Sequence, residues 1–205
     1  MKVLIIVDVQ NDFCPGGSLA TENGDRIIQR INKLSNSGFF DLVIATQDWH
    51  PEGHISFASA QKAQPFTEVN GEMVWPDHCI AGTKGAELRS SLDQRPINLI
   101  LRKGMNKDLD SYSAFLENDK ETQTQLPYLL AFYREDEQVD IYVVGIATEV
   151  CVYNTAMDSI KPYYYNTYLI EDVCSGVTPE GAEKAIQKME DAEVKIIHSN
   201  EILGG

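Results

Sequence analysis

The chain alternates between short apolar runs and segments of helical periodicity, and this alternation limits its fold more than any other feature. The apolar runs are rich in β-branched residues and have the length of buried strands: Val3–Val7, Leu42–Ala45, Leu99–Leu101, Ile141–Val144, Thr167–Ile170 and Val194–Ile197. Between them lie segments that we predict to be helical: Gly24–Ser37, Ala86–Leu92, Val150–Ile160 and Pro179–Ala192. We therefore predict an α/β fold, a three-layer sandwich with a central, mainly parallel sheet of about six strands and helices on both faces.

Some of the predicted helices carry further signals. The first has a set of apolar residues spaced to form one face: Ile27, Ile28, Ile31 and Leu34. The last follows Thr178, an N-cap residue, and has Pro179 at its first position.

Two segments do not fit the alternation. Residues 50–85 form a long loop rich in Pro and Gly, of the kind that is usually functional or mobile, and residues 117–140 predict a loop followed by a helix.

The size and the charge of the chain exclude several classes of protein. Its 205 residues contain no evident linker, which predicts a single domain over residues 1–205. A net charge of −14 repels nucleic-acid phosphates and anionic membranes, so neither is an expected partner. The N-terminal apolar run ends at Asp8 and is too short for a signal peptide, and no run approaches a membrane span. We therefore expect a cytoplasmic protein whose four cysteines, Cys14, Cys79, Cys151 and Cys174, are free thiols.

Three reactive side chains follow predicted strands, at the edge where open α/β sheets bind ligands. Asp8 follows the first predicted strand, Val3–Val7, and Lys103 follows the third, Leu99–Leu101. Cys151 falls in the first turn of the helix that follows the fourth predicted strand, Ile141–Val144. A helix N-terminus and a nearby cation both favour thiolate, so this pattern suits a nucleophilic hydrolase. Each residue also has an ordinary interpretation: a turn-capping Asp, a solvated Lys and a Cys packed as a small hydrophobe.

A second group of residues suggests a metal site. Asp48 and His50 follow the second strand two residues apart, which places both on one side of an extended segment. His54 and His78 lie in the adjoining long loop, so three of the four histidines fall in this region. Carboxylate and imidazole together bind divalent cations. The alternative is a set of hydrogen bonds that stabilise the loop.

Five motifs run in order over nearly the whole chain: residues 7–13 (VDVQNDF), 46–51 (TQDWHP), 75–79 (WPDHC), 103–104 (KG) with 110–115 (DSYSAF), and 145–152 (GIATEVCV). In this combination the chain resembles nicotinamidases, also called pyrazinamidases, of the isochorismatase-like cysteine hydrolase superfamily. The first and last motifs are widely shared in that superfamily, whereas the second and third are more particular to its metal-binding amidases. The 117–140 segment is longer than in compact members, and its role, as a lid or an oligomer contact, stays open.

The resemblance implies a role for each matching residue. Asp8, Lys103 and Cys151 would form the catalytic triad. The ligands of one divalent metal ion, Zn, Mn or Fe, would be Asp48, His50 and His78, with His54 as a further ligand in some members. The walls around a pyridine ring would be Phe13, Trp75 and Tyr112. The Ile146–Ala147 peptide would be cis, with the N–H groups of Ala147 and Cys151 facing an oxyanion.

The implied activity is hydrolysis of nicotinamide to nicotinate and ammonia through a cysteine thioester, which would serve NAD recycling. Pyrazinamide is a further candidate substrate, and the chain is a candidate to form a homo-oligomer. The alternatives within the superfamily are an N-carbamoyl amidase and a vinyl-ether hydrolase of the isochorismatase type. A non-catalytic binding module and a metal-storage protein are alternatives of other classes, although the latter leaves Asp8 and Lys103 without a task.

Overall fold

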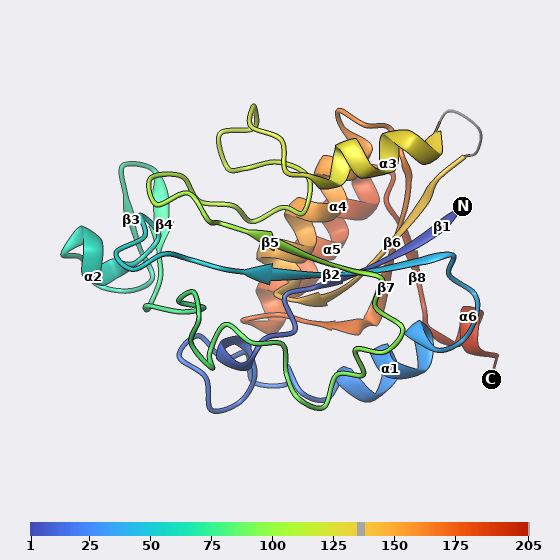
Figure 1. Ribbon diagram of the computed structural model, residues 1–205, viewed down its shortest axis with the longest axis horizontal. Helices are drawn as coiled ribbons and strands as arrows, with labels where there is room; N and C mark the ends of the chain where they lie inside the picture. Colours follow the sequence, from blue (N-terminus) through green and yellow to red (C-terminus); the bar gives the residue numbers. More distant parts are fainter. Residues whose placement is uncertain (135–137, 205) are drawn as a thin grey trace.

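The computed structural model describes residues 1–134 and 138–204 and contains a six-stranded parallel sheet (Figure 1). The strand order is β5-β2-β1-β6-β7-β8, and every neighbouring pair is parallel. The strands are β1 (Lys2–Val7), β2 (Leu42–Asp48), β5 (Leu99–Lys103), β6 (Asp140–Ile146), β7 (Asn166–Ser175) and β8 (Lys195–Ile197). The predicted three-layer α/β sandwich is confirmed.

Helices cover both faces of this sheet (Figure 1). One face carries α1 (Ile28–Ser35) and α6 (Asn200–Leu203), which contact each other. The other face carries α3 (Leu126–Arg134), α4 (Tyr153–Ile160) and α5 (Pro179–Asp191), and α4 directly continues a π-helical turn, η2 (Thr148–Val152). Among the described residues, no helix is both long and apolar enough to cross a membrane.

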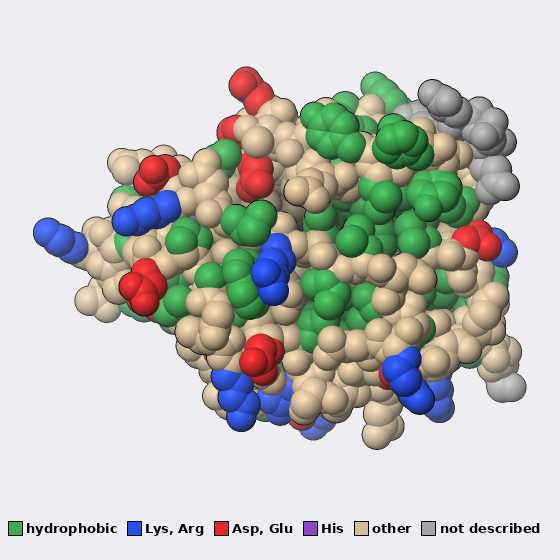
Figure 2. Space-filling view, viewed as in Figure 1, with side chains coloured by type: hydrophobic (Ala, Val, Ile, Leu, Met, Phe, Trp, Pro, Cys, Tyr) green, Lys and Arg blue, Asp and Glu red, His purple; other side chains and the backbone are tan. Residues whose placement is uncertain are grey.

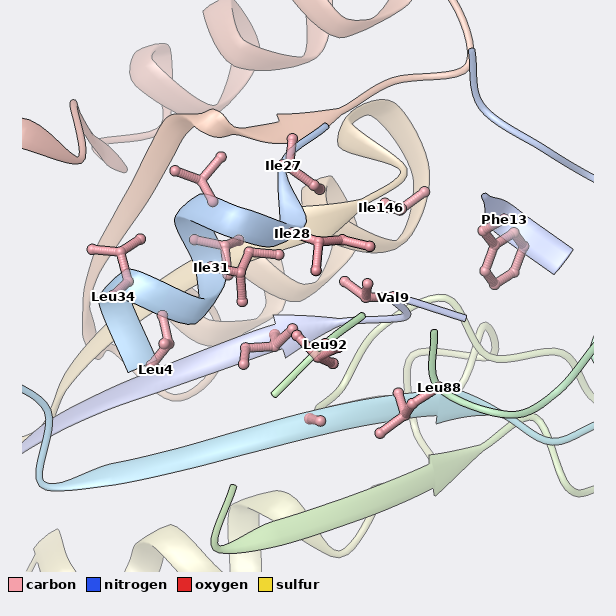
Figure 3. Packing of buried hydrophobic residues seen from close by; sticks show 14 of the residues in the cluster. Leu4, Val9, Phe13, Ile27, Ile28, Ile31, Leu34, Leu88, Leu92 and Ile146 are labelled. Atoms are coloured by element: carbon pink, nitrogen blue, oxygen red, sulfur yellow. The ribbon is translucent and has the colours of Figure 1, made fainter. Parts of the chain in front are cut away.

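Two hydrophobic cores form because successive residues of a strand point to opposite faces. In β1, Leu4 and Ile6 face the α1 side, where they pack near Ile28 and Ile31 (Figure 3). Val3, Ile5 and Val7 face the other side and pack with residues of α3, α4 and α5. Burying each such side chain contributes about 1.5–3 kcal/mol, so the two cores hold the central strands rigidly in place.

The long loop of residues 50–85 contains short elements that the sequence pattern did not predict. These are α2 (Ala58–Gln61) and an antiparallel hairpin of β3 (Thr67–Val69) and β4 (Glu72–Val74). They are too short to show a periodicity. In Figure 1 they project beyond the carboxyl ends of β2 and β5. The 3₁₀ turn η1 (Asn11–Phe13) follows β1 at this edge.

The predicted helix over residues 86–92 is wrong, because those residues form turns whose polar groups are bonded elsewhere. The carbonyl of Ala86 accepts hydrogen bonds from the amides of Gln10 and Gln47. The N–H of Arg89 donates to the carbonyl of Val9 at 2.8 Å. These long-range partners replace the i to i−4 bonds that a helix needs. The helix predicted from residue 24 begins only at Ile28, because the preceding residues form tighter turns.

The strand β5 is the edge of the sheet rather than a buried strand, which corrects the prediction for Leu99–Leu101. Leu99 and Ile100 are 36% and 42% exposed, and exposed aromatic side chains of α3, Tyr128 and Phe132, add to the apolar surface near it. Figure 2 shows hydrophobic side chains gathered on the face that carries α3. The sequence pattern cannot separate an apolar edge strand from a buried one. An edge of this kind is able to pair with another chain, and the homo-oligomer stays a prediction.

The remaining helix predictions agree with the structure. The prediction of a helix within residues 117–140 corresponds to α3, and its part over residues 135–137 lies outside the described residues. Helix α5 begins as expected, with the Thr178 side chain accepting a hydrogen bond from the N–H of Gly181 at 3.0 Å. The predicted helix from Val150 starts earlier, as the π-helical turn η2.

Candidate active site

The register of the sheet brings the reactive side chains together. Asp8 follows β1 and η2 follows β6, and these two strands are neighbours with Val7 paired to Gly145. Lys103 ends β5 directly beside Asp48, which ends β2. The strands β2 and β6 flank β1 on opposite sides, so the order of the sheet reverses there, and ligands bind at such a switch point.

Close packing at this point depends on a glycine. A Cβ at Gly145 would lie 2.1 Å from the carbonyl oxygen of Val7 and 2.7 Å from its nitrogen. Gly145 also has a φ of +124°, which a residue with a side chain rarely adopts. Asp8 has a left-handed backbone, with a φ of 48°, which Asp tolerates better than most residues. Both features turn the chain so that Asp8 faces the residues after β6.

The ammonium of Lys103 is the centre of a buried charge network. Its Nζ lies 2.9 Å from the Asp8 carboxylate and 3.6 Å from the Cys151 sulfur. It also forms an ion pair with Asp48 and donates to the carbonyl of Ser111 at 3.0 Å. Asp8 and Lys103 are 0% and 1% exposed. Predicted triad members that lie far apart in the sequence are thus in contact.

The pKa values in this network follow from burial and from the charges in contact. Burial raises the pKa of the Asp8 carboxyl, and Lys103 offsets only part of that rise. Burial also raises the pKa of the Cys151 thiol well above its usual value, with Lys103 acting in the opposite direction. For Lys103, burial disfavours the charge, but the carboxylates of Asp48 and Asp8 outweigh it and hold its pKa well above the usual value. Cys151 therefore rests as a thiol, and the Asp8 carboxyl beside it is the group that could accept its proton when ionised.

Asp48, His50 and His78 form the candidate metal site. One ligand atom from each lies within 4.8 Å of the others, and all three residues are buried. The Nε2 atoms of His50 and His78 lie 3.6 Å and 4.0 Å from Oδ2 of Asp48. The Nδ1 atom of His50 bonds to the carbonyl of Gly104 at 2.9 Å, and that of His78 to the carbonyl of Pro76 at 2.7 Å. Because a carbonyl oxygen only accepts, Nδ1 carries a proton in each ring, which leaves Nε2 as the nitrogen that could bind a cation.

The charges of these ligands suit a divalent cation. Burial, and then the neighbouring His50, lower the pKa of His78 to about 4, so His78 is neutral at pH 7. Burial opposes ionisation of Asp48, but Lys103 and His50 outweigh it and hold the pKa of Asp48 below its usual range. Ligating groups must be a neutral imidazole and an ionised carboxylate, which His78 and Asp48 supply. Burial opposes a charge on His50, but Asp48 outweighs it and raises the pKa of His50, so a cation bound there would take the place of a proton.

His54 lies beside this site in a different arrangement. Its Nδ1 bonds to the hydroxyl of Ser56 at 2.8 Å, and its Nε2 lies 3.4 Å from the carbonyl of Leu109. Its ring stacks on that of His50 with centroids 4.1 Å apart. Ligand atoms of His54 group with those of His50 and Asp110. In this structure His54 therefore supports the orientation of His50, and its predicted role as a ligand stays a prediction.

A cavity lies between Cys151 and the three residues of the candidate metal site. Loops after five of the strands contribute to its walls, which is why the sequence pattern could not outline it. It is lined by Phe13, Leu19, Thr21, Asp48, His50, Trp75, His78, Asp110, Tyr112, Ala147, Val150, Cys151 and Val177. The three aromatic residues predicted to surround a pyridine ring are all among them, and Trp75 donates to the hydroxyl of Tyr112 at 3.2 Å.

The predicted oxyanion residues lie at the start of η2. Cys151 is the fourth residue of this π-helical turn, and Ala147 immediately precedes it. The Ile146–Ala147 peptide is cis, as the resemblance implied. The carbonyl of Ala147 accepts from the N–H groups of Val150 and Val152 at 3.0 and 3.1 Å, which closes the turn around Cys151. Both Ala147 and Cys151 line the cavity, so their backbones are beside the space where a substrate carbonyl would lie.

The sequence analysis missed the residues that hold these groups in place. Gln10 is fully buried, and its amide donates to the carbonyl of Asp48 and accepts from its N–H, both at 2.8 Å. The hydroxyl of Thr46 donates to the Asp8 carboxylate at 2.6 Å. Gln10 and Thr46 could have been found, because each lies within one of the motifs. Leu19 and Val177 line the cavity but lie outside the motifs, so the sequence contained no signal for them.

The fold and the site define the chain as a three-layer α/β protein with the side chains of a cysteine hydrolase at the carboxyl edge of its sheet. It belongs to the isochorismatase family, because the isochorismatase domain matches residues 2–201. This confirms the resemblance found in the motifs.

Comparison with individual relatives shows which members of the family the chain is similar to. The chain is 44% identical to a nicotinamidase from Acinetobacter baylyi, over 98% of this chain and 94% of that protein. It is 36% identical to PnC1 from L. infantum, solved in complex with nicotinate, with a TM-score of 0.85 and coverage of 98% and 93%. It is 35% identical to the pyrazinamidase of Pyrococcus horikoshii, solved in complex with zinc, with a TM-score of 0.77 and coverage of 96% and 98%. The chain is thus similar to nicotinamidases over almost its whole length.

Proposed function

We propose that the chain is a metal-dependent nicotinamidase that hydrolyses nicotinamide to nicotinate and ammonia through a thioester on Cys151. One observation carries this proposal: Lys103 contacts both Asp8 and the Cys151 sulfur, and Cys151 lines a cavity together with Asp48, His50 and His78. The similarity to nicotinamidases supports the substrate. The product would serve NAD recycling, and pyrazinamide is a second candidate substrate.

The first half of the reaction breaks the carbon–nitrogen bond. Asp8 takes the proton of the Cys151 thiol, and the sulfur attacks the carboxamide carbon. Lys103 stabilises the negative charge as it moves from the sulfur. When the tetrahedral intermediate collapses, the C–N bond breaks, and Asp8 gives its proton to the leaving nitrogen, which departs as ammonia. A thioester between Cys151 and the nicotinoyl group remains.

The second half hydrolyses this thioester. Asp8, again ionised, takes a proton from water, and the water oxygen attacks the thioester carbon. The C–S bond breaks, the proton on Asp8 returns to the sulfur of Cys151, and the product leaves as the acid, which loses its remaining proton to solvent and becomes nicotinate. In both halves the N–H groups of Ala147 and Cys151 would stabilise the oxyanion, and losing one such donor typically costs about 3–4 kcal/mol.

The three residues of the candidate metal site fit one divalent cation. They offer one carboxylate and two imidazoles, with both Nδ1 atoms held by carbonyls and both Nε2 atoms toward Asp48. When bound, the cation would supply a Lewis acid for the pyridine nitrogen and so orient the carboxamide toward Cys151. Mixed carboxylate and imidazole ligands suit Zn, Mn and Fe.

The other candidate functions have less support. A vinyl-ether hydrolase would need neither the Cys151 thiol nor a metal, and an N-carbamoyl amidase would need the triad without this metal site. Cys151 and the three candidate metal ligands line the same cavity here, and Lys103 contacts both Cys151 and Asp48. A binding module would not need the Asp8–Lys103–Cys151 contacts at all.

A direct assay tests the proposal. Purified protein loaded with Zn, Mn or Fe is incubated with nicotinamide, and ammonia and nicotinate are measured together. We expect both products in equal amounts. Binding of nicotinate, seen as a rise in melting temperature, without any product from nicotinamide would instead indicate a binding module.

A further inference from the structure

The carboxylate of Glu149 links two segments of the site. Glu149 lies on η2, two residues before Cys151. Its Oε1 accepts hydrogen bonds from the N–H groups of Val177 at 3.0 Å and Thr178 at 2.9 Å, and its Oε2 lies 3.1 Å from the same Val177 nitrogen. Hydrogen bonds to a charged acceptor are roughly twice as strong as neutral ones. The carboxylate therefore ties the turn that bears Cys151 to the segment between β7 and α5.

Two glycines leave the space that this carboxylate fills. A Cβ at Gly176 would lie 2.8 Å from Oε2 of Glu149, and a Cβ at Gly181 would lie 2.8 Å from Oε1. A Cβ at Gly176 would also lie 2.8 Å from the Cβ of Ala182, and one at Gly181 would lie 2.7 Å from the hydroxyl of Thr178, so a larger residue at either position would crowd the carboxylate together with the start of α5. Helix α5 has its own N-cap in Thr178, which accepts from the N–H of Gly181. Capping the helix thus does not require Glu149.

The held segment reaches the cavity through Val177. Its side chain is 37% exposed and lines the cavity together with Cys151 and the aromatic walls. Because Glu149 holds the backbone N–H of Val177, it fixes where this side chain lies relative to the sulfur. The turn around Cys151 is held separately, by the Ala147 carbonyl and by the contact with Lys103.

We propose that Glu149 is a positioning residue for substrate binding: it holds Val177 against the cavity, and Val177 restricts how the pyridine ring is seated. This inference rests on the proposed function, since it assigns a part of the same site. Glu149 does not touch the reacting atoms, so its loss is expected to weaken binding of the substrate and to leave the chemical step unchanged.

The test is the steady-state kinetics of Glu149→Ala, with ammonia release from nicotinamide as the assay. We expect KM to rise about tenfold while kcat stays within about twofold, the signature of lost binding that is equal in the ground and transition states. Glu149→Gln keeps one oxygen that can accept a hydrogen bond, and its KM is expected to lie between those of the wild type and Glu149→Ala. The matched control is Glu180→Ala, which removes an exposed acid from the first turn of α5 and is expected to leave KM unchanged.

A double-mutant cycle tests whether Glu149 acts through Val177. Val177→Ala is expected to raise KM by itself, and adding Glu149→Ala to it is expected to raise KM no more than about twofold further. Gly176→Ala, which displaces the carboxylate without removing it, is expected to raise KM as Glu149→Ala does. Thermal unfolding of each variant accompanies the kinetics, because a merely structural role would lower stability without the rise in KM.

Three results would overturn the inference: a fall in kcat of more than about twofold in Glu149→Ala, an unchanged KM in that variant, or KM increases that multiply in the cycle. Failure of the proposed function is distinguishable from these. A wild-type protein that binds nicotinate in calorimetry but releases no ammonia would refute the proposed function alone. The same variants would then test the inference through nicotinate affinity, with the same tenfold weakening expected for Glu149→Ala.

Discussion

The ammonium of Lys103 lies 3.6 Å from the sulfur of Cys151, although 48 positions separate the two residues. The same ammonium pairs with the carboxylates of Asp8 and Asp48, both fully or almost fully buried. Lys103 therefore contacts both the candidate nucleophile and a candidate metal ligand. This shared contact links the two parts of the proposed mechanism and makes specific predictions about each.

Replacing Lys103 by Met is expected to destabilise the fold by about 3–5 kcal/mol, because it leaves buried carboxylates without their cation. Denaturation by urea measures the change. The matched control is Lys120→Met, which removes a half-exposed ammonium from its pair with Asp158 and is expected to cost less than Lys103→Met. Equal losses in the two variants would contradict the account of the buried network.

Replacing Cys151 by Ala is expected to lower the rate of ammonia release by more than about 10³-fold and to leave the fold intact. The removed atom is the nucleophile, and the change makes only a small cavity. Cys174→Ala serves as the control, since this thiol lies at the end of β7 and its loss is expected to leave turnover intact. Substantial turnover by Cys151→Ala would rule out the covalent route.

The pH dependence follows from the carboxyl of Asp8. Burial raises the pKa of Asp8, and only the ionised carboxylate can take the thiol proton. As the pH falls through this raised pKa the base is lost, so kcat/KM is expected to decline in acid at a pH above the ordinary Asp value of about 3.9. The profile is measured at several metal concentrations. A decline that moves with metal concentration would assign it to loss of the metal instead of Asp8.

Removing the metal is expected to weaken nicotinate binding and to abolish turnover, with both restored by adding Zn, Mn or Fe. His78→Ala removes one of three ligands and is expected to lower metal affinity by at least about tenfold. Elemental analysis gives the metal content, and calorimetry gives the affinity for nicotinate. Full turnover by protein verified to be free of metal would remove the metal from the mechanism.

Replacing Gln10 by Ala is expected to weaken the metal site, because Gln10 holds the backbone of the candidate ligand Asp48 in place. Both the N–H and the carbonyl of Asp48 would lose a buried partner, at a cost of about 1–3 kcal/mol for each unsatisfied group. Metal affinity and the free energy of unfolding should both fall. Gln10→Glu, which restores only the acceptor, should lie between wild type and Gln10→Ala. An unchanged metal affinity in Gln10→Ala would show that Asp48 is held by other contacts.

The comparison of sequence and structure shows which features a pattern can reveal. The strands after which Asp8, Asp48 and Cys151 lie were predictable, because β-branched apolar runs are a strong signal and parallel strands end at one edge. That these side chains meet depends on the strand order, with β1 between β2 and β6, which the pattern does not specify. The resemblance to a family, rather than periodicity, supplied their grouping.

The errors have physical causes as well. Residues 86–92 have helical spacing, but their polar backbone groups are bonded to Gln10, Gln47 and Val9, which are distant in sequence. Leu99 and Ile100 were predicted to be buried, yet they lie on an edge strand. Glu149 and Val177 lie 28 positions apart, so their contact had no signature in the sequence. Each case is a tertiary contact that overrides a local preference.

The covalent intermediate on Cys151 is the central claim, and mass spectrometry of protein quenched in acid during turnover tests it most directly. With saturating nicotinamide, we predict a species heavier by one nicotinoyl group in place of a hydrogen, located by peptide mapping at Cys151, that disappears once the substrate is consumed. Rapid turnover with an unmodified Cys151, or with the adduct on another residue, would contradict the account.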